Sequence, residues 1–176
     1  ADNISGLLGE TGFRQYMDQQ DTPLETGYLL RIGIDHFKEI NDNFGQEYGD
    51  FVLRKTADCI SGCISEVQKV YKLVADEFLI LDVSSDKVRD AEKLYDKMRE
   101  EIGRFIEANE FKVMYTVSGG IVPFVTLGGD QYSEALKLTD FALNEAKKLG
   151  RNRCYIYNEE TYRRFLRKRE ITQELR

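Results

Sequence analysis

The sequence is poor in the side chains from which zinc sites and nucleophilic catalytic pairs are usually built. His36 is its only histidine, and only three cysteines accompany it. Zinc ligands come mainly from clusters of histidine and cysteine, and one histidine cannot supply such a cluster. A Ser–His or Cys–His pair would depend on His36 alone. We therefore expect neither a zinc centre nor nucleophilic catalysis of this kind.

Long apolar runs and surplus positive charge are missing as well. No segment approaches the roughly 20 apolar residues that a transmembrane helix needs, so we expect no membrane contact by these residues and no signal peptide. The net charge is −6. This charge argues against nucleic-acid binding, because a polyanion normally requires a clustered basic face.

The cysteines point to a reducing compartment. Cys59, Cys63 and Cys154 are odd in number, and the first two lie four residues apart, on one face of a predicted helix. This pattern indicates reduced, buried thiols in a cytoplasmic setting. The chain begins at Ala1 without a methionine. We therefore expect a cytoplasmic domain of a longer protein, and a membrane anchor elsewhere in that protein stays open.

The residues that are present resemble those of an ordinary soluble domain, with 41% hydrophobic and 32% charged side chains. Helical spacing of apolar residues predicts helices, whereas β-branched and aromatic runs predict strands. The predicted order is a short helix near 13–17, a strand at 27–34, a helical turn at 37–40, a break at 41–45, a helix at 51–65, a β-hairpin at 71–81, a helix at 87–105, a strand at 113–123, a loop at 126–130, a helix at 133–149 and a strand at 153–157.

This order contains the β-α-β-β-α-β core of ferredoxin-like folds. We predict one α+β domain over residues 1–158, with an antiparallel central sheet of the ferredoxin-like or nucleotide-cyclase-like type flanked by helices. Asp35 ends the first strand and is expected to cap the next helical turn. Residues 159–176 are predicted to form a charged helix with an apolar stripe made of Tyr162, Phe165 or Leu166, Ile171 and Leu175.

The hairpin carries adjacent carboxylates, Asp76 and Glu77, at or just after its tip. Carboxylates on a loop that two strands hold rigidly are suited to a metal or phosphate site. A solvated acidic turn is the commoner explanation of such a pair. The rest of the chain has to decide between the two.

Several motifs together resemble the GGDEF domain, the family that makes cyclic di-GMP from two GTP molecules. The opening D-N-I-S-G-L-L at 2–8 resembles the family's D-x-L-T-G-L. I-D-H-F-K-E-I-N-D-N-F-G-Q-E-Y-G-D at 34–50 resembles F-K-x-I-N-D-x-x-G-H-x-x-G-D, and A-L-N-E-A-K-K-L-G-R-N at 142–152 resembles A-L-Y-x-A-K-x-x-G-R-N. Between them, V-A-D-E-F at 74–78 stands where G-G-D-E-F belongs.

The chain departs from the family at the positions that catalysis needs. Val74 and Ala75 replace two glycines that adopt positive φ and approach the nucleotide closely, so the turn is expected to be strained or of another type. The resemblance places a metal-binding aspartate where this chain has Gly33. Metal binding then falls to Asp76, with at most Glu77 and a backbone carbonyl such as that of Ile34. We expect low or absent cyclase activity, with Mg²⁺ or Mn²⁺ present only if a nucleotide binds.

The product-inhibition motif of the family is also missing. Residues 65–68 read S-E-V-Q where R-x-x-D is expected. No arginine is available there to bind a phosphate with paired N–H groups. We therefore predict no inhibitory site.

Four residues match the family's nucleotide-binding positions. Asn41 and Asp50 match the pair that recognises guanine, and Lys147 and Arg151 match the residues that hold the terminal phosphates. Taken singly, Asn41 would more often be a turn asparagine and Asp50 a helix N-cap. The two cations would also suit a solvated C-terminal turn of a helix. Together the four suggest that GTP binds even without turnover.

The last residues, R-E-I-T-Q-E-L-R at 169–176, resemble the connector from a GGDEF domain into a following EAL domain, the family that hydrolyses cyclic di-GMP. The favoured hypothesis is a catalytically degenerate GGDEF domain that acts as a regulatory or GTP-sensing module, next to an EAL or sensor domain of the same chain. The alternatives are a weakly active diguanylate cyclase and a structural domain that binds no nucleotide. We expect a monomer or a weak homodimer.

Overall fold

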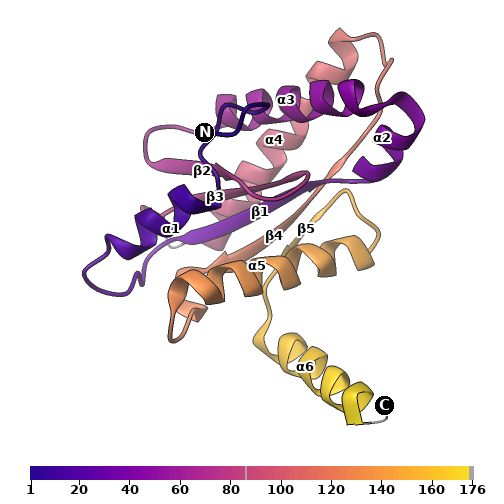
Figure 1. Ribbon diagram of the computed structural model, residues 1–176. Helices are drawn as coiled ribbons and strands as arrows, with labels where there is room; N and C mark the ends of the chain where they lie inside the picture. Colours follow the sequence, from indigo (N-terminus) through magenta and orange to yellow (C-terminus); the bar gives the residue numbers. More distant parts are fainter. Residues whose placement is uncertain (86, 175–176) are drawn as a thin grey trace.

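One five-stranded sheet forms the centre of the domain. The computed structural model describes residues 1–85 and 87–174. The strands lie in the order β2-β3-β1-β4-β5, with helices on both faces of the sheet (Figure 1). Their bounds are β1 Tyr28–Ile34, β2 Gln68–Lys72, β3 Glu77–Asp82, β4 Val117–Pro123 and β5 Cys154–Ile156. Pairing is antiparallel except between β4 and β5, so the predicted α+β fold is confirmed with one parallel edge strand.

The helices divide between the two faces. Their bounds are α1 Glu10–Asp18, α2 Phe37–Phe44, α3 Gln46–Cys63, α4 Val88–Ala108, α5 Gln131–Lys148 and α6 Glu159–Glu174, with a short 3₁₀ turn at Phe124–Thr126. Side chains from α2, α3 and α4 share one buried core with the sheet, and α1 and α5 share the other. All seven residues of β1 are buried between these cores. A strand covered on both faces favours a continuous apolar run, which is why β1 was recognisable in the sequence.

Backbone contact sets the distance between α5 and the sheet. A Cβ atom at Gly120 of β4 would lie 2.4 Å from the backbone nitrogen of Leu143 and 2.7 Å from the carbonyl carbon of Ala142. Real Cβ atoms do not approach other atoms so closely. Gly120 thus lets α5 rest directly on β4.

Several predicted boundaries were wrong: α3 begins at Gln46 rather than 51, and the hairpin begins at Gln68 rather than 71. The break expected at 41–45 is confined to Gly45, whose φ of 91° suits glycine, and α2 therefore runs on through Asn41 to Phe44. The strand expected from 113 begins only at Val117, which pairs with the last residue of β1, Ile34. Residues before Val117 have no neighbouring part of β1 to pair with, although Val113 and Tyr115 are buried.

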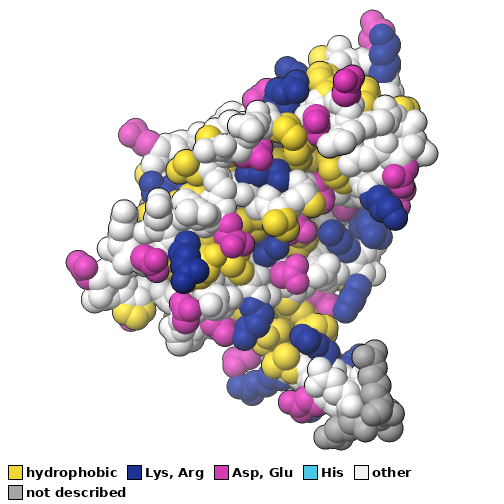
Figure 2. Space-filling view, in the orientation of Figure 1, with side chains coloured by type: hydrophobic (Ala, Val, Ile, Leu, Met, Phe, Trp, Pro, Cys, Tyr) yellow, Lys and Arg dark blue, Asp and Glu magenta, His cyan; other side chains and the backbone are white. Residues whose placement is uncertain are grey.

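The C-terminal helix contacts the domain through aromatic rings. Phe141 of α5 lies with its ring centroid 5.0 Å from that of Tyr162 and 5.1 Å from that of Phe165. Figure 2 shows hydrophobic surface at this junction, with basic side chains around it. The stripe predicted on α6 is thus used through Tyr162 and Phe165, while Ile171 is exposed and Leu175 lies outside the described residues.

The cysteines are free in the structure, and Cys63 is buried while Cys59 and Cys154 are partly buried. Burial raises the pKa of Cys59 to about 11, which keeps this thiol protonated at neutral pH. Among the residues that the structure describes, no helix is long and apolar enough to cross a membrane.

Candidate functional site

The hairpin turn, the start of α2 and the loop after α5 meet at the C-terminal end of β1. The turn between β2 and β3 lies against this end, because Asp76 Oδ2 accepts a hydrogen bond of 2.9 Å from the backbone N–H of Ile34. α2 begins three residues beyond Ile34, and the loop that follows α5 is hydrogen-bonded to Asp35. Burial raises the pKa of Asp76, an effect that the Glu77 charge reinforces and the Lys147 ammonium opposes. Asp76 is thus not an exposed turn residue. Its ionised form is less favourable at this position than in water.

Glu77 is held by a buried arginine that the sequence analysis did not single out. Arg31 Nε and Arg31 Nη2 each lie 2.7 Å from Glu77 Oε1. The side chain of Arg31 is only 9% exposed, and its Nη1 donates to the carbonyl of Leu136 and to Thr139 Oγ1 on α5. Arg31 and Gly33 lie on the same face of β1, and Gly33 is directly opposite Glu77 in the strand register. An arginine in an apolar run is the only sequence signal for this pair.

Position 33 faces both carboxylates. A Cβ atom at Gly33 would lie 3.6 Å from Asp76 Oδ2 and 3.7 Å from Glu77 Cγ. An aspartate there would therefore add a third carboxylate, but glycine offers no oxygen. Among the described residues, no group of three or more His, Cys, Asp or Glu side chains could hold a metal ion. Asp76 meets Ile34 through the amide N–H rather than through a ligand oxygen. The residues present therefore fit a divalent cation poorly.

The hairpin turn accommodates its two substituted positions differently. Ala75 adopts the left-handed region with φ of 57°, whereas Val74 keeps a negative φ and is 75% exposed. Only Ala75 therefore carries the backbone strain that was expected of both residues. The buried ammonium of Lys72 donates to the carbonyl oxygens of Leu73 and Ala75, at 2.6 and 2.5 Å. Lys72 thus fixes the turn from within, although burial lowers its pKa.

Asn41 carries an unsatisfied buried oxygen. Asn41 Oδ1 is the one buried side-chain nitrogen or oxygen atom without a hydrogen-bond partner among the residues that the structure describes. It packs against α3, where a Cβ atom at Gly49 would lie 1.7 Å from it. Asp50 is the next residue of α3 and is partly buried. Asn41 lies inside α2 and Asp50 inside α3, so the readings as a turn residue and as an N-cap were wrong.

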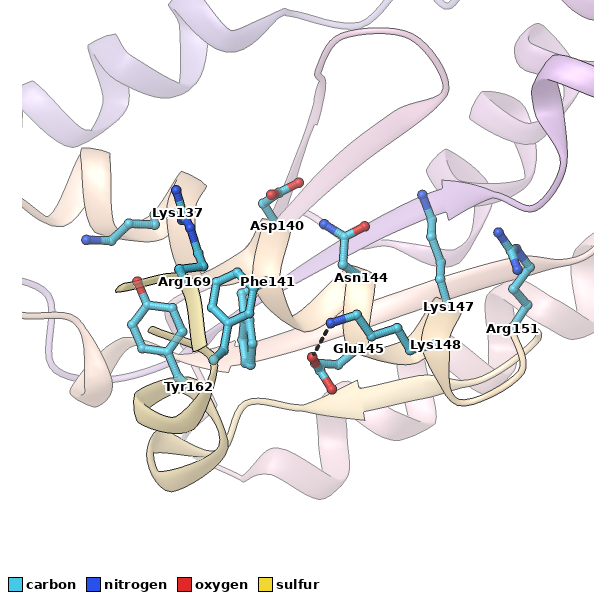
Figure 3. Close-up of a pocket in the computed structure, with 11 residues that line it drawn as sticks. Lys137, Asp140, Phe141, Asn144, Glu145, Lys147, Lys148, Arg151, Tyr162 and Arg169 are labelled. Atoms are coloured by element: carbon cyan, nitrogen blue, oxygen red, sulfur yellow. Dashed lines mark hydrogen bonds and ion pairs between the residues drawn. The ribbon is translucent and has the colours of Figure 1, made fainter. Parts of the chain in front are cut away.

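Lys147 lies in the last turn of α5, and Arg151 lies in the loop that follows this helix. Figure 3 shows Lys147 and Asn144 projecting from one side of α5, whereas Lys148 turns toward Glu145 and pairs with it at 3.3 Å. The side chains of Lys147 and Arg151 form no ion pair with any described residue. Both also border a cleft of about 460 Å³ between α5 and α6. A C-terminal turn of a helix favours a cation such as Lys147 whether or not a ligand binds.

Asp35 ties the strand end to the loop that follows α5. It accepts hydrogen bonds from Thr116 Oγ1 at 2.5 Å, Ser118 Oγ at 2.6 Å and the backbone N–H of Asn152 at 3.1 Å. The N-cap of α2 is His36, and no side chain caps this helix. The predicted capping role of Asp35 was therefore wrong. Its actual partners lie more than 80 residues away in the sequence.

Residues 65–68, which occupy the position of the family's inhibitory motif, form hydrogen bonds within the fold. Gln68 Nε2 donates to Asp82 Oδ2 at 2.8 Å, and Gln68 Oε1 accepts from the backbone N–H of Ser65. No arginine or aspartate stands at either end of 65–68. The absence of an inhibitory site stays a prediction.

Comparisons with known proteins agree with this geometry. The family model described as "Diguanylate cyclase, GGDEF domain" matches residues 1–153. A diguanylate cyclase of Vibrio cholerae is 34% identical over 75% of this chain and 40% of its own length. The cyclic di-GMP phosphodiesterase NbdA of Pseudomonas aeruginosa is 27% identical over 99% of this chain and 23% of its own length. The chain therefore spans less than half of these relatives.

Solved structures share the fold. The GGDEF domain of TpbB (YfiN) from Pseudomonas aeruginosa superposes with a TM-score of 0.77 at 24% identity, over 94% of this chain and 98% of that one. The structure of the active GGEEF domain of a diguanylate cyclase from Vibrio cholerae has a TM-score of 0.65 at 28% identity, over 85% of this chain and 90% of that one. At 24% identity, the similarity to the TpbB domain shows a shared fold and no more.

Proposed function

Because the chain belongs to the GGDEF domain family, we propose that it is a catalytically degenerate member that binds GTP and acts as a regulatory module in cyclic di-GMP signalling. Diguanylate cyclases among its relatives supply the substrate class. The observation that carries the nucleotide part is the unsatisfied oxygen of Asn41. Leaving a buried acceptor unpaired costs about 1–3 kcal/mol, and a donor on a ligand would remove this cost.

Guanine suits the groups around Asn41. Its ring edge carries N–H donors beside a carbonyl acceptor, so it can donate to Asn41 Oδ1 and to the carboxylate of Asp50. Adenine presents no such pair of neighbouring donors on that edge. Lys147 and Arg151 supply positive charge for the phosphates. These four groups belong to α2, α3, the last turn of α5 and the loop that follows it, and we propose that they form one site near the end of β1.

Turnover is not part of the proposal, for reasons of geometry. Gly33 offers no carboxylate beside Asp76, and Val74 places an exposed branched side chain at the hairpin tip. Asp76 and Glu77 are then remnants of the family's catalytic pair. We expect the domain to be a monomer or a weak homodimer, since cyclases of this family need two domains face to face.

The regulatory part of the proposal depends on α6 and on a following domain of the same chain. The match to the phosphodiesterase NbdA extends over 99% of this chain and thus includes α6. We propose that 1–158 form the GGDEF domain and that 159–176 connect it to a following EAL domain, with GTP binding altering the orientation of α6. A sensor domain before residue 1 would supply a second input.

The test is calorimetric titration of GTP into the domain, with ATP for comparison. GTP is expected to bind, and Asn41→Ala or Asp50→Ala is expected to weaken binding about tenfold or more, the equivalent of one hydrogen bond of roughly 1.4 kcal/mol. Gly49→Ala should weaken GTP binding as well, because the added methyl group displaces the Asn41 amide.

Gly62→Ala is the matched control on the same helix, since a Cβ atom there meets nothing within 4 Å. It should leave GTP affinity unchanged. Absence of GTP binding would leave only a structural domain. Formation of cyclic di-GMP in Mg²⁺ or Mn²⁺, lost in Asp76→Ala, would instead identify a weak cyclase.

A further inference from the structure

Arg31 is a buried cation in the central strand of the sheet. Its guanidinium contacts Glu77 on β3 through two nitrogens and the first half of α5 through the third, and Nη2 also lies 3.8 Å from Asp140. An arginine cannot lose its proton in a protein. A permanent positive charge therefore stands beside the carboxylates of the hairpin.

This charge competes with a divalent cation for the same oxygens. Mg²⁺ requires about six oxygen ligands in near-octahedral geometry. Glu77 Oε1 is committed to the guanidinium, Asp76 Oδ2 to the N–H of Ile34, and position 33 supplies nothing. A cation that used Glu77 Oε1 would have to displace Arg31 from this close ion pair, which would leave the buried guanidinium with only the more distant carboxylate of Asp140. Such an exchange would be strongly unfavourable, because a buried charge loses its close partner.

The phosphate side of the site has its own positive charge. Lys147 acts electrostatically on Asp76, and Arg151 follows α5 in a tight turn in which its backbone N–H donates to the carbonyl of Ala146 at 3.1 Å. That turn is closed on the other side by the bond from Asn152 to Asp35. Lys147 therefore lies within electrostatic reach of the hairpin, and Arg151 is held by the backbone of a loop that is tied to Asp35 at the end of β1. Neither side chain has an ion-pair partner among the described residues.

We propose that the site binds GTP without a divalent cation, with Arg31 balancing Glu77 and with Lys147 and Arg151 balancing the phosphates. The nucleotide half of this inference rests on the proposed function. The cation half rests only on the contacts of Arg31, Gly33 and Asp76, and it holds whether or not a nucleotide binds.

The first experiment compares GTP titrations of the purified domain in Mg²⁺ and in EDTA. The dissociation constants are expected to agree within about twofold. A loss of affinity of tenfold or more in EDTA, equivalent to about 1.4 kcal/mol, would overturn the proposal. Absence of GTP binding in both buffers would refute the proposed function, and the cation half would then be decided by the second experiment.

The second experiment titrates Mn²⁺ alone and follows the free ion by electron paramagnetic resonance. The unaltered domain and Gly33→Ala should show no site that depends on Asp76. The double variant Gly33→Asp with Arg31→Met gathers three carboxylates and should bind Mn²⁺ at least tenfold more tightly than Gly33→Asp alone. Mn²⁺ binding by the unaltered domain that Asp76→Asn abolishes would overturn the proposal. Equal binding by the single and double variants would overturn the role of Arg31.

Discussion

Ionisation of Asp76 is less favourable in the folded protein than in the unfolded chain. Burial raises its pKa above the ordinary value of 3.8, so the folded state holds this proton more tightly than the unfolded chain does. Protonation therefore favours folding, and this contribution to stability is lost as the pH rises from 3.8 through the raised pKa. Above the raised pKa, the ionised carboxylate is a constant cost.

Asp76→Asn is accordingly expected to raise the free energy of unfolding at pH 7. The amide keeps an oxygen for the N–H of Ile34 and removes the charge. The gain should shrink as the pH falls through the raised pKa toward 3.8, and urea unfolding at a series of pH values measures it. Asp21→Asn in an exposed loop is the control and should show no such trend. A loss of stability in Asp76→Asn at pH 7 would mean that attraction to Lys147 outweighs burial.

At the scale of single residues, the sequence predicted the candidate site positions but not the contacts that these residues make. Motif positions identified Asn41, Asp50, Lys147 and Arg151 as candidates, and their role in one nucleotide site stays a prediction. The pairing of Arg31 with Glu77 was out of reach, because it joins residues 46 positions apart and depends on the register of two strands. Only the fold shows that Asn41 Oδ1 lacks a partner.

Among the elements, the β2–β3 hairpin carries local strain that a single substitution can relieve. Left-handed backbone costs an L-residue roughly 1–2 kcal/mol, and Ala75 adopts it. Ala75→Gly should therefore raise the free energy of unfolding by roughly 0.5–1 kcal/mol, after allowance for the greater entropy of glycine in the unfolded chain. Chemical denaturation measures this change.

Val74→Gly is the comparison at the neighbouring position. Val74 has no positive φ to relieve and is largely exposed. Its replacement by glycine should be neutral or destabilising. Equal stabilisation by both variants would show that the turn as a whole, rather than Ala75, is strained.

Element types were easier to predict than their ends. Periodicity found the long helices and the buried strand β1, because both patterns extend over many residues. The end of α2 depends on one glycine, and the start of β4 depends on where β1 ends. The local pattern of apolar residues predicts neither boundary. The parallel placement of β5 was also a matter of tertiary packing.

In the whole molecule, α6 is held by few contacts, mainly the rings of Tyr162 and Phe165 against Phe141. Phe165→Ala should release α6, because such ring pairs contribute roughly 0.5–1.5 kcal/mol. We expect amide hydrogens of α6 to exchange several-fold faster, while the exchange of the sheet is unchanged. Leu166→Ala, on the exposed side of the same helix, should leave exchange unaltered. Unchanged protection in Phe165→Ala would assign the docking of α6 to other contacts.

The close backbone contact between α5 and Gly120 affects the part of the site that is proposed to bind the phosphates. Backbone lies on backbone there, so α5 has no room to sink toward the sheet, and any side chain at 120 would lift it. The height of Lys147 above the carboxylates is thus fixed by a residue that contributes no atom to binding. A displacement of α5 that left the sheet intact would have to be a slide along the strands or a movement away from the sheet, because closer approach is blocked.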